Sequence, residues 1–187
     1  MSTAQQNTGF TNRLKAFWGA EHVLSAPDSL ERYPQDIWQA GAPIAAVARP
    51  ADTAQLAGLA QLAAEGGISL VARGGGMSYT RAYTQTRPGV VMVCTRRMDA
   101  VLEINADDMT VTVQAGCTWA ALYEALGKHN LRTPYWGPLS GRYATVGGSV
   151  SQNSIFLGGS RYGSAADIVV SMEIVLANCD ILRTGSA

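Results

Sequence analysis

Three consecutive glycines directly after a short apolar segment constrain the fold more than any other feature of the chain. The apolar segment covers residues 68–72, and Arg73 separates it from Gly74, Gly75 and Gly76. Such a segment is typical of a buried strand, and glycine readily adopts positive φ. We therefore expect a strand that ends in a tight loop, whose backbone N–H groups can converge on an anion. A tight turn without a ligand is the alternative interpretation.

The residues before this loop predict a strand–helix–strand unit. Residues 44–48 are apolar and end at Arg49-Pro50, as a short strand would. Asp52-Thr53 is a helix start, leucines and alanines then recur at helical spacing, and Gly66-Gly67 ends the helix. With residues 68–72 as the second strand, the crossover should be right-handed and its two strands parallel.

The residues after the loop predict shorter strands and helices. We expect a hairpin of residues 101–104 and 110–113, because residues 105–108 have turn character. The remaining expected strands are residues 90–93, 168–177 and 181–183, and the remaining expected helices are residues 12–19, 119–126 and part of 146–153.

Two further segments are rich in glycine and hydroxyl side chains, namely residues 140–153 and 158–163. Small residues let a backbone approach a flat ligand, so three such segments indicate an extended dinucleotide. A P-loop is excluded because no Gly-Lys-Ser/Thr triplet occurs. A Rossmann fingerprint is disfavoured because the residues after the three glycines have β character.

Together these segments resemble the FAD-binding (PCMH-type) domain of the vanillyl-alcohol oxidase / p-cresol methylhydroxylase superfamily, the FAD-linked oxidases. The matching motifs are RGGGMSYT, QAGCTW, ATVGGSVSQNS, SRYG and MEIVLANCDILRTG, in the family's order from about residue 23 onward. The resemblance implies an α+β fold with two lobes, a small parallel βαβ lobe and a larger, mostly antiparallel sheet with helices. Residues 1–40 would be an N-terminal helical segment. Residues 41–187 would be the FAD-binding domain, with lobes of about 41–95 and 96–187, incomplete at the C-terminus.

The resemblance also implies the cofactor-binding residues. The triple-glycine loop through Ser78 would wrap the diphosphate, and the later segments would lie along the ribityl chain and the flavin. The full set is Gly74, Gly75, Gly76, Met77, Ser78, Tyr79, Ser140, Thr145, Gly147, Gly148, Ser151, Ile155, Tyr162 and Gly163. Many relatives carry a covalently flavinylated His where Met77 stands, so we expect non-covalent FAD. The family's Asn-Gly turn is Asn178-Cys179 here.

The resemblance implies an FAD-dependent oxidoreductase that removes a hydride from an alcohol, a 2-hydroxy acid or a phenolic carbon. Its substrate would be bound through a missing C-terminal domain or a partner chain, so no catalytic residue is predicted. A non-catalytic FAD- or nucleotide-binding module, or a subunit completed by a partner, is the main alternative. The UDP-N-acetylmuramate-forming reductase shares the fold, but the SRYG motif disfavours it.

Composition limits the remaining classes. Lys plus Arg equals Asp plus Glu at 14 each, which gives no sign of a nucleic-acid partner. The three cysteines match no metal-binding spacing, so no metal is expected. No apolar run is long enough for a membrane span and no signal peptide is visible, so we expect a cytoplasmic protein. Tyr135 and Trp136 could stack on a ring or anchor a loop in the core.

Overall fold

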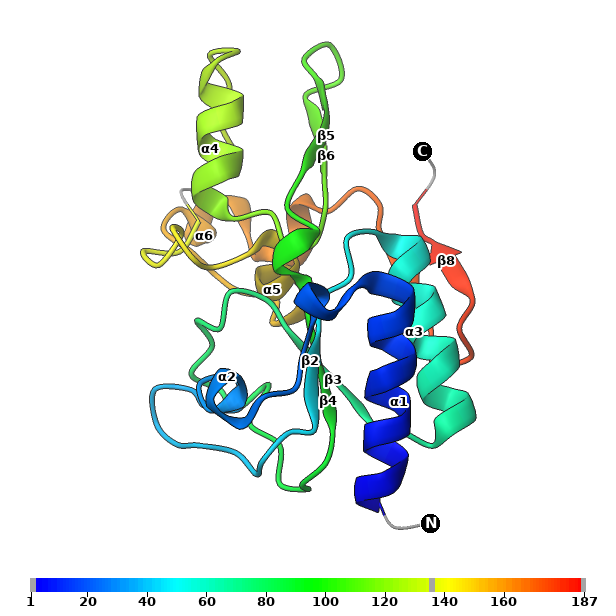
Figure 1. Cartoon of the computed structure of the whole chain (residues 1–187). Coiled ribbons are helices and arrows are strands. Elements are labelled where there is room, and N and C mark those ends of the chain that lie inside the picture. The colour runs from blue at the N-terminus through cyan, green and yellow to red at the C-terminus, as the bar shows by residue number, and fades with distance from the viewer. Residues whose placement is uncertain (1–2, 135–136, 186–187) are drawn as a thin grey trace.

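The computed structural model describes residues 3–134 and 137–185 (Figure 1). Tyr135 and Trp136 therefore lie outside the described residues. Across the described part of the chain, no helix has both the length and the apolar character that crossing a membrane requires. The described helices are α1 (Thr3–Trp18), η1 (Ala20–His22), α2 (Pro27–Leu30), α3 (Thr53–Gly66), η2 (Thr95–Arg97), α4 (Trp119–Gly127), α5 (Val146–Ser151), α6 (Gly159–Tyr162) and η3 (Ala165–Ile168).

The main sheet has four strands in the order β1-β2-β4-β3. Its strands are β1 (Val23–Leu24), β2 (Ala46–Ala48), β3 (Leu70–Arg73) and β4 (Val91–Cys94). Strands β2 and β3 both pair in parallel with β4, which lies between them. The predicted strand–helix–strand unit with parallel strands is therefore confirmed. All three parallel strands end at one edge of the sheet, and the triple-glycine loop leaves from that edge.

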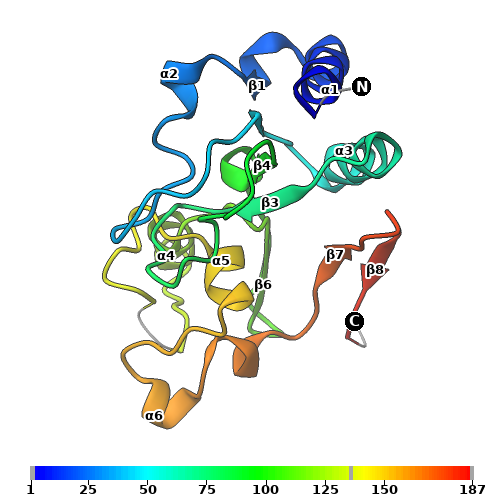
Figure 2. The same ribbon diagram turned by 90° about the horizontal axis from the view of Figure 1, so that it is seen from below.

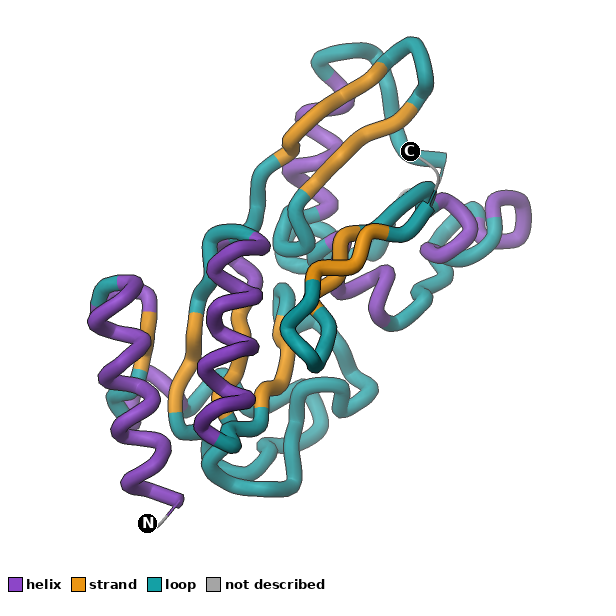
Figure 3. The backbone as a smooth tube through the Cα atoms, turned by 90° about the vertical axis from the view of Figure 1, so that its right-hand side faces the viewer, coloured by secondary structure: helices purple, strands orange, loops and turns teal. Residues whose placement is uncertain are grey.

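The two faces of this sheet are covered by different layers. Ala46 and Ala48 of β2 face the layer that contains α1 and α3, while Val47 between them faces the opposite layer. This alternation follows from the two-residue period of a strand. Figure 3 shows α1 and α3 side by side across one face, and Figure 2 shows α2 on the other side of the sheet. The opposite layer includes Tyr33 and Tyr83, which lie near the end of β3.

Helix α1 is longer than the sequence pattern predicts. We expected a short helix over residues 12–19, but the structure has a helix over Thr3–Trp18. Phe10 and Leu14 of α1 are 5% and 0% exposed, and they pack in one cluster with Leu59 of α3. The first helix is thus part of the core that covers the sheet.

The second part of the chain contains a hairpin and a helix that share a core. Strands β5 (Val101–Asn105) and β6 (Thr110–Val113) pair antiparallel, as the sequence predicts. The buried side chains Trp119, Leu122 and Leu126 of α4 pack against this hairpin. Figure 1 shows α4 and the β5–β6 hairpin standing together beyond the ends of the parallel strands.

The last hairpin, β7 (Glu173–Val175) with β8 (Ile181–Arg183), is shorter than expected. The sequence predicts one strand over residues 168–177, yet residues 165–168 form a 3-10 helix and only three residues of this run pair as a strand. At the turn between the two strands, Cys179 has φ of 73°. A glycine suits this left-handed conformation better, so the Asn178-Cys179 sequence retains the turn's backbone with a less suitable residue.

Candidate functional site

The triple-glycine loop packs directly against the segment that leads into α5. A Cβ atom on Gly75 would overlap the carbonyl oxygen of Tyr143, and a Cβ atom on Gly74 would overlap Oγ1 of Thr145. No residue with a side chain fits at Gly75 without moving one of the two backbones. The glycines at 74 and 75 are therefore required for two distant segments of the chain to touch.

The carbonyl groups of the loop are held from one side. Tyr83 donates its hydroxyl proton to the Gly76 carbonyl oxygen at 2.7 Å and reaches the Ser78 carbonyl oxygen at 3.3 Å. Arg96 donates from Nη2 to the Gly75 carbonyl oxygen at 3.2 Å. Within the described residues, by contrast, no acceptor receives a hydrogen bond from the backbone N–H groups of residues 74–79. The loop thus presents a run of unpaired donors.

The start of α5 is fixed by Thr145, which is 2% exposed. Its side chain caps the helix by accepting from the Gly148 backbone N–H at 3.2 Å. Gly147 lies so close to Ala115 that an added Cβ would come within 2.7 Å of the Ala115 carbonyl oxygen. Ser149 accepts a hydrogen bond from Trp119 Nε1 at 2.8 Å, which ties α5 to α4. These contacts hold α5 beside the triple-glycine loop.

A side-chain hydrogen bond also joins the two segments. Gln152 Nε2 donates to Ser78 Oγ at 2.6 Å, and the Thr80 hydroxyl lies 2.9 Å from the same oxygen. Ser151, one residue earlier, donates its hydroxyl proton to the Gly147 carbonyl oxygen. The structure therefore brings together the predicted residues at 74–78 with those at 145–151.

The other predicted residues have different surroundings. Tyr162 packs in the α4 core, and Gly163 has φ of 79° and lies against Asp167. Ile155 is 74% exposed and touches Gly159. Among the predicted residues not yet described, the carbonyl of Ser140 accepts from two backbone N–H groups of its turn, and the side chains of Met77 and Tyr79 are 38% and 66% exposed.

Sequence reasoning missed four residues that shape this site. Tyr83 and Arg96 donate to carbonyl groups of the loop, and Arg73 lies where a Cβ atom on Gly76 would be. Gln152 donates to the Ser78 hydroxyl. A charged residue at the end of an apolar strand is a sequence signal for Arg73. The other three contacts depend on tertiary folding, and the sequence gives no local sign of them.

These features suit an extended anion with many oxygen atoms. Unpaired backbone N–H groups in a glycine-rich turn form a concave donor surface for phosphate oxygens. Burial lowers the pKa of the Arg73 guanidinium, but arginine remains a cation at neutral pH. The donors, the nearby cations and the close glycine packing together fit a diphosphate.

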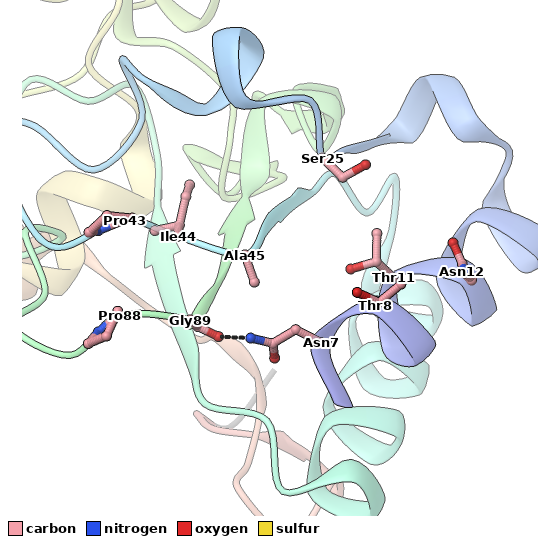
Figure 4. A pocket seen from close by; sticks show the side chains of 10 residues that line it. All are labelled: Asn7, Thr8, Thr11, Asn12, Ser25, Pro43, Ile44, Ala45, Pro88 and Gly89. Atoms are coloured by element: carbon pink, nitrogen blue, oxygen red, sulfur yellow. Dashed lines mark hydrogen bonds between the residues drawn. The ribbon is translucent and has the colours of Figure 1, made fainter. Parts of the chain in front are cut away.

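A cavity of about 410 Å³ lies elsewhere, between α1 and the chain before β2 and β4 (Figure 4). Asn7 of α1 donates to the Gly89 carbonyl oxygen across it at 3.0 Å. Its lining has hydroxyl and amide groups but no ionisable side chain. It lies at the start of the parallel strands, whereas the triple-glycine loop leaves from their ends. The loop junction is therefore the better site for an anionic ligand.

The fold and the junction together suit a cofactor that contains a diphosphate. Comparison with known proteins identifies that cofactor. Residues 44–185 match the family described as the FAD binding domain. The chain belongs to this family, and its cofactor is FAD.

Two curated relatives and one solved structure illustrate the likeness. Glycolate oxidase subunit GlcD of Bacillus subtilis is 34% identical over 140 residues, which cover 75% of this chain and 29% of that protein. D-2-hydroxyglutarate dehydrogenase of Pseudomonas putida is 31% identical over 187 residues, which cover 97% of this chain and 17% of that protein. The chain thus spans less than a third of the length of these relatives.

The structure of p-cresol methylhydroxylase with bound substrate matches with a TM-score of 0.81 at 20% identity. The match covers 97% of this chain and 36% of that one. At this identity the likeness shows the fold, and it confirms the predicted α+β architecture of the PCMH-type domain.

Proposed function

We propose that this chain is the FAD-binding part of an oxidoreductase that removes a hydride from a 2-hydroxy acid. The observation that carries the proposal is the run of unpaired N–H groups at residues 74–79. The loop that bears them packs directly against the segment at 143–148, and the chain belongs to the FAD-binding family. The substrate class rests on two relatives whose names specify glycolate and 2-hydroxyglutarate, which are both 2-hydroxy acids. The resemblance also implies other alcohols and phenolic compounds as alternative substrates.

We propose that the predicted residues hold the cofactor in two groups. Residues 74–79 contribute backbone donors for the diphosphate, and residues 145–151 form the adjoining wall. FAD, when bound, supplies the hydride acceptor, and the protein orients it. Ser140, Ile155, Tyr162 and Gly163 stay part of the proposed set on the strength of the resemblance.

The proposal extends to the division of the chain and to its partners. We propose an N-terminal helical segment over residues 1–40 and an FAD-binding domain over 41–187, with lobes that meet near residue 95. The match over residues 44–185 supports a domain that begins near residue 41. Because the matched residues cover only 29% and 17% of these two relatives, we propose that substrate-binding groups lie outside these 187 residues, in the same or another polypeptide. We also propose a cytoplasmic location.

A second candidate is a subunit that binds FAD and is completed by a partner chain. The relative GlcD is itself named as a subunit of glycolate oxidase, which favours this candidate. The two candidates share the cofactor site and differ in where oxidation of the substrate takes place.

The test is anaerobic titration of the FAD-loaded chain, alone and together with the polypeptide that supplies the substrate-binding groups, with glycolate, D-lactate, D-2-hydroxyglutarate and p-cresol. Loss of the flavin absorbance on addition of a hydroxy acid, with p-cresol inactive, supports the proposed function. Reduction that occurs only when a separate partner chain is present would favour the subunit candidate, and bound FAD that none of the four compounds reduces in either case would contradict the proposed function. FAD at about 100 times its dissociation constant should also add about 2.7 kcal/mol to the free energy of unfolding. The lack of any thermal shift would contradict both candidates.

Acid precipitation is expected to release all of the flavin into the supernatant. The family resemblance implies a flavin-linked His in many relatives at the position of Met77, and a thioether cannot form that bond. The measurement is absorbance of the supernatant and of the redissolved pellet. A pellet that stays yellow would contradict the prediction, and replacement of Met77 with alanine would show whether that position is involved.

A further inference from the structure

Arg73 holds a positive charge that lacks a carboxylate partner within residues 3–134 and 137–185. Its side chain is half-buried, and its Nε atom is buried without a hydrogen-bond partner. A charge removed from water is costly unless another charge or a strong hydrogen bond compensates for it. Within the described residues, the cation at the end of β3 therefore has no anionic partner.

The position of this guanidinium is fixed by two aromatic rings and by the triple-glycine loop. Its Cζ atom lies 5.2 Å from the ring centre of Tyr33 and 5.0 Å from that of Tyr83. A Cβ atom on Gly76 would overlap the guanidinium, so Arg73 lies directly against the loop. The rings attract the cation and keep it beside the backbone that carries the unpaired N–H groups.

Arg96 brings a second cation to the same loop. It donates to the Gly75 carbonyl oxygen at 3.2 Å, and no carboxylate within the described ranges forms an ion pair with it. Arg73 and Arg96 are close enough to repel each other, which lowers the pKa of Arg73 further. Two like charges without acidic partners repel each other, and an anion placed near both is attracted to each of them.

We propose that Arg73 and Arg96 are the counter-charges of the FAD diphosphate, acting from behind the triple-glycine loop. This inference rests on FAD binding at the loop, which the proposed function also requires. Both residues are positioning residues, because their guanidinium groups contact the loop's backbone and its aromatic neighbours. Their positive charge stabilises an anion that the loop's N–H groups hold directly.

The experiment compares FAD affinity in wild type, Arg73→Gln and Arg96→Gln, by quenching of flavin fluorescence at several salt concentrations. Each variant should bind FAD about tenfold or more weakly at low salt, because charges near a protein surface interact by more than a kilocalorie per mole. Raising KCl from about 0.02 M to about 0.5 M should weaken wild-type binding steeply and variant binding less steeply, because salt screens the interaction.

Arg97→Gln is the matched control. It removes the same charge one residue away, but Arg97 donates to the Arg49 carbonyl oxygen instead of to the loop. Its FAD affinity and salt dependence should match those of wild type. Weaker binding by Arg73→Gln or Arg96→Gln with a wild-type salt dependence would overturn the proposal, as would an equal loss in Arg97→Gln. In those cases wild type still binds FAD, whereas failure of wild type to bind FAD would overturn the proposed function as well.

Discussion

Replacing Gly75 with valine is expected to weaken FAD binding by at least about a hundredfold, which corresponds to about 2.7 kcal/mol. A side chain at this position would overlap the Tyr143 carbonyl oxygen, which belongs to the backbone and cannot rotate away. The triple-glycine loop must then separate from the segment before α5, and the two walls of the site lose their relative positions. The measurement is titration calorimetry with FAD on the purified chain.

Gly58→Val is the matched control for this substitution. Gly58 is an exposed residue of α3, and no atom lies within 4 Å of a Cβ built on it. The same change there should leave FAD affinity as in wild type. Wild-type affinity in Gly75→Val would refute the assignment of the loop. Far-ultraviolet circular dichroism should show that both variants keep their helices, so that any loss of binding can be assigned to the site.

Replacing Leu14 with alanine is expected to lower the free energy of unfolding by about 2 to 5 kcal/mol. Leu14 is fully buried between α1 and the sheet, in the cluster that also contains Leu59 and Ala63 of α3. The substitution removes buried methyl groups and leaves a cavity that the surrounding strands cannot fill completely. Urea unfolding of the chain without FAD measures the effect, since the midpoint should fall while the slope stays the same.

Phe17→Ala is the control on the same helix. Phe17 is 74% exposed, so its removal should change the free energy of unfolding by no more than about 0.5 kcal/mol. Equal stability of Leu14→Ala and wild type would show that α1 is not part of the core in solution. The comparison therefore tests whether the residues before the matched family region contribute to the stability of the domain.

Local signals in the sequence predicted the parallel unit and the start of α3 at Asp52; the cap at Thr145 was not predicted, although it follows the same rule. Asp52 and Thr145 are followed by helices, and each side chain accepts from a backbone N–H of the first turn. Such caps depend on residues three positions apart, so the pattern is visible in the sequence. The sequence also predicted α4, because Trp119, Leu122 and Leu126 recur at helical spacing, and all three are buried in the structure.

The sequence could not predict features that depend on distant partners. Residues 168–177 are rich in β-branched side chains, but a strand needs a neighbour, and β8 pairs with only three of them. The first turns of α1 contain threonine, asparagine and glutamine, and these polar residues do not show the apolar pattern that predicts a helix. The helix is held in the core by Phe10 and Leu14. Arg73 contacts the ring of Tyr33, which is 40 positions earlier in the chain, and the ring of Tyr83, which comes later. No local sequence pattern predicts either contact.

The interlocked loops also bear on the order of events in folding. Ser78 and Gln152 are 74 positions apart, yet their side chains meet at the proposed cofactor site. Closing so long a loop costs entropy that only later contacts recover, so a complete site forms after both parts of the chain have taken their places. FAD should accordingly bind late in folding, to a chain whose sheet is already assembled. Quenching of flavin fluorescence during refolding would then time the last step, the closure of residues 143–152 onto the triple-glycine loop.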